Sequence, residues 1–90
     1  MCGAPAGATL TVTASGNRVG ESISSTPAGI NVAVGSTASA TFPVGTSITL
    51  RVSNGRTALW SGLCNSAAGR DTNTCTFTLN ASGSETGNVQ

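Results

Sequence analysis

The chain has 90 residues, enough for one small domain, and its core must be built with two Phe, one Trp and no Tyr. Four Arg and three acidic residues give a net charge of +1, and Lys and His are absent. This charge excludes strong electrostatic attraction to nucleic acid or an anionic membrane, and no apolar run approaches the roughly 18 residues of a membrane span.

The N-terminal residues 1–8 are predicted to be a loose lead-in, followed by a single β-rich module over residues 9–90. Residues 1–5 lack the basic start and the apolar stretch of a signal peptide. An exported chain with this sequence would therefore have lost its leader or would use another route.

Short runs that alternate apolar and hydroxyl residues, separated by turn signals, predict strands in the first half of the chain. Residues 9–14 show this alternation clearly. We expect residues 19–25 to form the returning strand with Val19, Glu21 and Ile23 on one face, where the charge of Glu21 fits poorly. Further strands are predicted at residues 30–34 and 38–42.

The clearest strand in the second half is residues 47–52, with Ile48, Leu50 and Val52 on its buried side. The dipeptide Asn54-Gly55 predicts a tight turn. We then expect a brief strand at residues 58–60, a polar loop over 61–74, a strand at 75–79 and a weakly structured end over 80–90. These short strands, without any sustained helical period, predict an all-β fold: a small antiparallel sandwich or meander.

Cys64 and Cys75 bracket the polar loop, and a disulfide between them would stabilise the fold by about 3 kcal/mol. A zinc site is disfavoured because the chain has no His and no Cys-x-x-Cys pair. Free buried thiols are the other alternative. The disulfide predicts an exported protein, extracellular or at the cell surface. Cys2 is the odd cysteine, and it is interpreted as an exposed thiol, an intermolecular link or a residue whose partner lies in missing flanking sequence.

Five segments in order resemble the divergent internalin B-repeat-like modules of bacterial secreted and cell-surface proteins, over roughly residues 9–79. The most specific of them is Trp-Ser-Gly-x-Cys (60–64) followed by Thr-Cys (74–75); the others are residues 10–13, 25–30 and 40–50. The resemblance implies a small grasp-like module, often tandem, without catalytic residues of its own. Residues 85–89 match the family's closing strand poorly, so we expect the C-terminal edge to be paired by another chain or by a neighbouring module.

A catalytic function is disfavoured by the residue types that the chain lacks. Without His or Lys there is no ordinary Ser-His or Cys-His activation of a nucleophile, no Schiff base and no Ser-Lys dyad. Glu21, Asp71 and Glu85 are scattered in turns and polar segments, where carboxylates are usually solvated rather than paired in a cleft. We therefore predict a protein that is not an enzyme and has no cofactor and no metal.

Two residues are candidates for contacts with a ligand or partner. Trp60 could stack on a sugar, although a core position is favoured in a chain with three aromatic residues. Arg56, beside the Asn54-Gly55 turn, could contact an acidic partner, and the competing interpretation is a solvated loop tip. Unpaired strand edges are a third feature, because an exposed edge can pair with another chain.

The leading hypothesis is thus a structural or interaction module, a spacer or adhesion repeat that contacts neighbouring modules or protein partners through its edges. A carbohydrate-binding module that uses Trp60 for glycans is the first alternative. The second is a subunit of an extracellular filament or phage particle, with Cys2 or the terminal segments linking the protomers. None of the three needs nucleic acid or membrane insertion.

Overall fold

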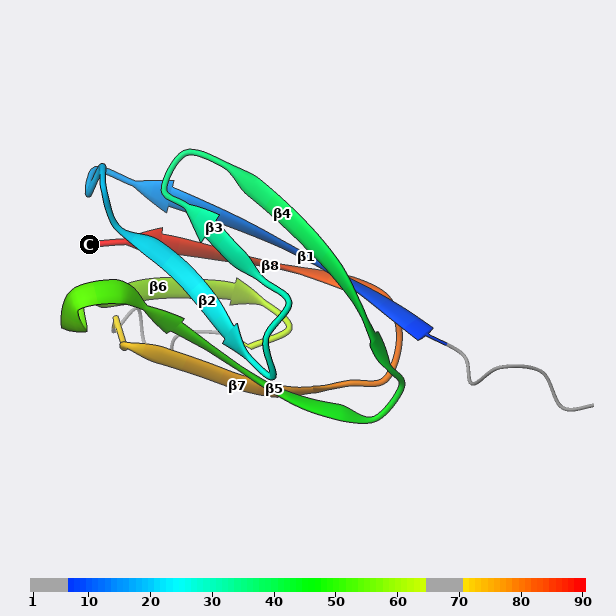
Figure 1. Ribbon diagram of the computed structural model, residues 1–90. Coiled ribbons are helices and arrows are strands. Elements are labelled where there is room, and N and C mark those ends of the chain that lie inside the picture. The colour runs from blue at the N-terminus through cyan, green and yellow to red at the C-terminus, as the bar shows by residue number, and fades with distance from the viewer. Residues whose placement is uncertain (1–6, 65–70) are drawn as a thin grey trace, which may run out of the picture.

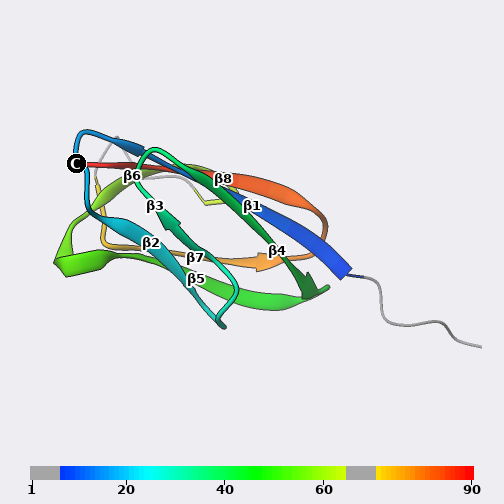
Figure 2. The same cartoon turned by 45° about the horizontal axis from the view of Figure 1, so that its top comes forward.

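The protein is a sandwich of two four-stranded sheets, shown from two directions in Figures 1 and 2. The structure is a computed structural model that describes residues 7–64 and 71–90. Sheet A has the strand order β4-β1-β8-β6, and sheet B has the order β3-β2-β5-β7. The strands are β1 (Gly7–Gly16), β2 (Ser22–Thr26), β3 (Asn31–Ala33), β4 (Thr37–Pro43), β5 (Thr46–Val52), β6 (Ala58–Gly62), β7 (Thr74–Leu79) and β8 (Gly83–Val89).

The predicted all-β sandwich with one disulfide is confirmed, and the alternation of apolar and hydroxyl residues explains it. Strand β1 places Leu10 and Val12 in the core while its Thr residues face outward, and β5 buries Ile48 and Leu50 in the same way. These side chains meet between the sheets, since successive residues of a strand point to opposite faces. The other buried apolar residues of the core are Ala8, Ala14, Ile23, Ile30, Val32, Phe42, Val52, Ala58, Trp60, Cys75, Leu79 and Val89.

The expected strand over residues 19–25 is shorter than predicted. Strand β2 begins at Ser22, and the preceding residues form a turn in which the Glu21 N–H donates to the Arg18 carbonyl at 3.2 Å. Gly20 adopts a positive φ of 100° within it. Val19 is therefore 89% exposed instead of facing the core with Ile23.

The C-terminal segment was expected to be weakly structured or to form an open edge, and both expectations are wrong. Strand β8 lies inside sheet A, parallel to β1 on one side and antiparallel to β6 on the other. Its inward positions are Gly83, Glu85, Gly87 and Val89, and only the last of them is a typical core residue. The sequence of β8 therefore does not show the alternation of apolar and polar residues that marks a half-buried strand.

Gly87 shows why β8 needs a small inward residue. It lies directly opposite Trp60 of β6 in the register of sheet A. A Cβ atom at this position would lie 2.6 Å from Ile23 Cδ1 and 2.8 Å from Trp60 Cζ3, closer than real Cβ contacts. The indole ring thus occupies the space that a side chain on β8 would take.

The parallel β1–β8 pair makes sheet A mixed, whereas a purely antiparallel fold was expected. Seven residue pairs are in register, from Leu10 opposite Gly83 to Gly16 opposite Val89. Because the two strands run the same way, β1 begins at one end of the sandwich and β8 finishes at the other (Figure 1).

The Asn54-Gly55 turn is confirmed, but it joins strands of different sheets. Ser53–Gly55 form a single 3-10 turn (η1) between β5 of sheet B and β6 of sheet A, and Asn54 has a φ of 53°. Over residues 7–64 and 71–90 there is no α-helix, so the helix that a grasp-like fold packs on its sheet does not occur there. Nor does this part of the chain contain any helix with the length and hydropathy of a membrane span.

Candidate functional site

The predicted disulfide between Cys64 and Cys75 is present and joins the two sheets. Cys64 lies two residues after the end of β6 in sheet A, and Cys75 is the second residue of β7 in sheet B, with their Cα atoms 6.2 Å apart. Cys75 is buried and Cys64 is half-buried. The cross-link therefore joins the two sheets on the side where β6 and β7 form their edges, and the backbone bridge between Ala58 and Thr72 joins the same side.

Glu85 lies directly against this disulfide, which the sequence did not indicate. Its side chain is 1% exposed, because β8 directs it into the sandwich. One carboxyl oxygen, Oε1, accepts a hydrogen bond from the Cys64 backbone N–H at 2.8 Å, and the Leu63 backbone donates a second one. Burial raises the pKa of Glu85, and the two backbone bonds offset part of this rise. The expectation that this acid is solvated is wrong.

Cys64, Cys75 and Glu85 are also the residues that could hold a metal ion. One ligand atom from each lies within 4.8 Å of the others, and Glu85 Oε2 is 3.8 Å from the Cys64 Sγ. A disulfide sulfur carries no proton and is a poor donor to a metal. In the oxidised protein this group therefore offers a single carboxylate.

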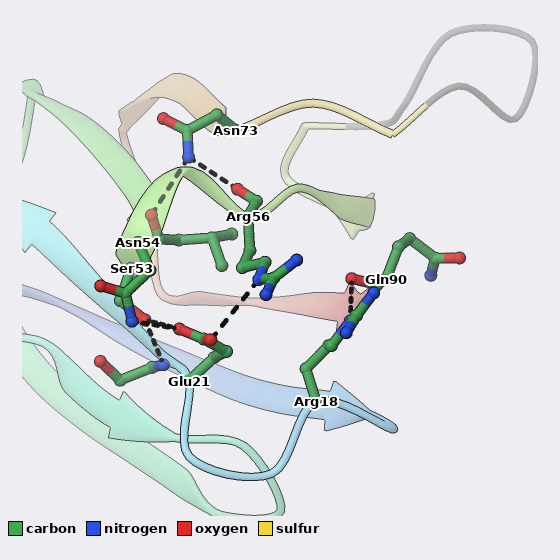
Figure 3. Close-up of polar contacts among 9 residues, drawn as sticks. Arg18, Glu21, Ser53, Asn54, Arg56, Asn73 and Gln90 are labelled. Carbon is green, nitrogen blue, oxygen red and sulfur yellow. Dashed lines mark hydrogen bonds and ion pairs between the residues drawn. The ribbon is translucent and has the colours of Figure 1, made fainter.

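A second polar group, the Glu21 cluster, consists of Glu21, Ser53, Asn54 and Arg56 and is drawn in Figure 3. The Ser53 hydroxyl and the Asn54 side-chain amide donate to Glu21 Oε1 at 2.6 and 2.9 Å. Arg56 Nε lies 3.6 Å from the other carboxyl oxygen. The hydrogen bond from Ser53, then that from Asn54, and then the charge of Arg56 lower the pKa of Glu21, with burial opposing them.

The turn that carries this cluster is fixed from two sides. Ser53 Oγ accepts the backbone N–H of Ser22 at 2.9 Å, which ties the turn to the start of β2. Asn73 Nδ2 donates to the carbonyl oxygens of Val52 and Arg56 at 3.1 and 2.7 Å (Figure 3). Arg56 is 45% exposed and forms an ion pair with Glu21 within the chain.

We expect the Glu21 cluster to make stability decline in acid. The pKa of Glu21 is lowered in the folded state from its usual 4.5, so its interactions stabilise the fold fully above that value and are lost as pH falls through the folded-state pKa. The hydrogen bonds dominate, since the partner Arg56 is half-exposed and an exposed ion pair contributes little.

The measurement is urea unfolding of the wild type and of Glu21→Gln from neutral pH into acid. The difference in the free energy of unfolding should be largest at neutral pH and should shrink towards zero below the folded-state pKa. The variant itself serves as the control for the titration of the other acids. A difference that does not change with pH would show that the carboxylate form is not what these residues stabilise.

Trp60 occupies the core position that was favoured over sugar stacking. Its side chain is 3% exposed, and Nε1 donates to the Thr72 carbonyl at 3.0 Å. Cys2 lies outside the described residues. The predicted residues do not form one common site, because Trp60 lies in the core, Arg56 lies at the η1 turn and the disulfide lies beside Glu85.

Strand β4 presents an uncharged edge of sheet A. It pairs with β1, and no other described strand pairs with its second side. On the outer face, the hydroxyl oxygens of Thr37 and Thr41 lie 3.2 and 3.4 Å from those of Thr13 and Thr9. These two pairs set Thr side chains side by side along the β1–β4 ladder.

The surface formed by residues 7–64 and 71–90 contains no pocket. Comparison with protein-family models, with curated proteins and with solved structures finds no match. The geometry of the chain itself is therefore the basis for a functional proposal.

Proposed function

We propose that the chain is a non-catalytic, extracellular structural or interaction module of a bacterial secreted or surface protein, a spacer or adhesion repeat. The buried disulfide supports an oxidising compartment, because such bonds persist there. The positions of the chain ends support a spacer: β1 starts at one end of the sandwich and β8 finishes at the other, so modules in tandem would extend end to end.

The observation that carries the interaction role is the open edge of β4. This strand is Thr37–Pro43, Thr-Ala-Ser-Ala-Thr-Phe-Pro, and it contains no charged residue. Natural proteins usually protect an edge with a charge, a proline, a bulge or a very short strand, and an edge without them invites pairing with another chain. In β4 the only such residue is Pro43 at its end, so Thr37 to Phe42 remain open to pairing. On the inward face Ala38 and Ala40 are only half-buried, so an added strand would cover apolar surface as well as backbone groups.

The occupant that fits this edge is the β4 strand of a second copy. An antiparallel pair centred on Ala40 places Ser39 opposite Thr41 and Ala38 opposite Phe42, so hydroxyl residues meet on one face and apolar residues on the other. The two sheets A then join into one sheet of eight strands. Because one edge pair buries little area, the association is expected to be weak and dependent on concentration.

Sedimentation velocity over a range of protein concentrations tests this proposal. The average sedimentation coefficient of the wild type should rise with concentration, since the β4 pair forms a dimer. The double variant Ser39→Lys with Thr41→Lys should remain monomeric, because the symmetric pair sets the new like charges opposite one another.

The matched control is Thr26→Lys with Ser47→Lys, which adds the same charge at exposed positions of the inner strands β2 and β5. It should associate like the wild type. A monomeric wild type at all concentrations, or an unchanged association in the β4 double variant, would overturn the proposal that β4 mediates the interaction.

A further inference from the structure

The fold alone does not explain why a carboxylate is buried at Glu85. It lies among core residues on β8, and within the described part of the chain no Arg forms an ion pair with it. A Gln at this position could accept the Cys64 backbone N–H through its amide oxygen without the cost of burying a charge. An acid at this position therefore suggests that the site binds a cation.

The two sulfurs of the disulfide lie beside the Glu85 carboxylate. Glu85 Oε2 lies 3.8 Å from the Cys64 Sγ, and the ligand atoms of Cys64, Cys75 and Glu85 all lie within 4.8 Å. In a tetrahedral zinc site with ordinary bond lengths, thiolate and carboxylate atoms are about 3.6 Å apart. The carboxylate thus already stands at the distance from one sulfur that a shared zinc ion requires.

We propose that reduction of the Cys64–Cys75 disulfide converts these two cysteines and Glu85 into a binding site for a thiophilic divalent cation such as Zn²⁺. The ligands come from the end of β6, from β7 and from β8, so the metal would replace the disulfide as the link between the sheets. A Cα–Cα distance of 6.2 Å leaves the thiolates free to separate to about 3.8 Å by side-chain rotation. This metal site does not depend on the role of β4.

The chemistry balances with a small dithiol as the reductant. The dithiol gives two electrons and two protons, the Cys64–Cys75 bond breaks to two thiols, and the dithiol closes to its own disulfide. The metal then forms two bonds to sulfur and one to the Glu85 carboxylate, and the two thiol protons pass to water. A water molecule completes the fourth position. The site therefore exists before the disulfide forms, or after it is reduced.

Cobalt(II) is the probe, because thiolate ligation gives a charge-transfer absorption that other ligands do not. Protein with the Cys2→Ser substitution is reduced with a dithiol, freed of it without oxygen and titrated with Co²⁺, which Zn²⁺ then displaces. We expect one Co²⁺ per chain with the thiolate absorption in the reduced protein, and none in the oxidised protein. Circular dichroism followed during the titration reports whether the metal also restores folding if reduction has loosened the sheets.

Substitutions test the ligands one at a time. Cys75→Ser leaves a single thiolate, so the absorption typical of two sulfur ligands should be lost. Glu85→Gln should weaken metal affinity by roughly 10–100-fold, at least as much as the loss of an outer-shell partner. Glu21→Gln removes a distant carboxylate and should bind like the parent. If the reduced parent protein binds Co²⁺ no better than Glu85→Gln, or shows no thiolate absorption, the proposal is wrong.

Discussion

Replacing Trp60 with alanine is expected to lower the free energy of unfolding by about 3–5 kcal/mol, the range for removal of a large buried aromatic side chain. The indole ring lies over Gly87 in sheet A, which Ile23 of sheet B also approaches, and its Nε1 donates a hydrogen bond to the Thr72 carbonyl. The glycine opposite cannot fill the space that the ring leaves. A domain of this size has a total stability of about 5–15 kcal/mol, so Trp60→Ala should bring the protein close to its unfolding threshold.

Urea unfolding followed by circular dichroism measures this loss, because the variant has no tryptophan fluorescence. Val19→Ala is the control: Val19 is 89% exposed, and its truncation should change stability by less than about 0.5 kcal/mol. Equal unfolding midpoints for the wild type and Trp60→Ala would mean that the ring does not pack between the sheets.

Removal of the disulfide should be the next largest effect. Cys64→Ala with Cys75→Ala, in a Cys2→Ser background, is expected to cost about 2–4 kcal/mol. The loss arises because the cross-link, 11 residues apart in sequence, restricts the unfolded chain and joins β7 of one sheet to the end of β6 in the other. The substitutions leave the backbone N–H of residue 64, which donates to Glu85, so the expected loss reflects the disulfide and its two sulfur atoms.

Reductant provides the internal control for the disulfide experiment. Added to the Cys2→Ser parent in metal-free buffer, a dithiol should move the urea midpoint most of the way to that of the double alanine variant, and it should leave the variant itself unchanged. A parent protein that unfolds at the same urea concentration with and without reductant would show that the bond contributes nothing to stability.

The sequence predicts the strands whose inward residues are recognisably apolar. Strands β1 and β5 alternate clearly, and both were predicted close to their observed bounds. Strand β8 was missed because Gly83, Glu85 and Gly87 occupy three of its four inward positions. Gly87 faces Trp60, which lies 27 residues earlier in the chain, so no local pattern could reveal why this inward position is a glycine.

The polar groups could likewise be predicted only where the residues involved lie close together in the sequence. The disulfide could be predicted because two cysteines flank one loop and the chain has no His and no Cys-x-x-Cys pair. Glu85 could not be placed beside it, because that contact depends on the position of β8. The Glu21 cluster joins Glu21 with Ser53, residues 32 apart in sequence that meet only when β2 pairs with β5.

The parallel arrangement of β1 and β8 determines how the protein responds to tension. A force that pulls Gly7 and Val89 apart drives these two strands past each other along their length, so the hydrogen bonds between them are loaded together in shear. Antiparallel neighbours pulled from one end would instead open one bond at a time, like a zipper. The seven residue pairs in the middle of sheet A therefore act as a mechanical clamp.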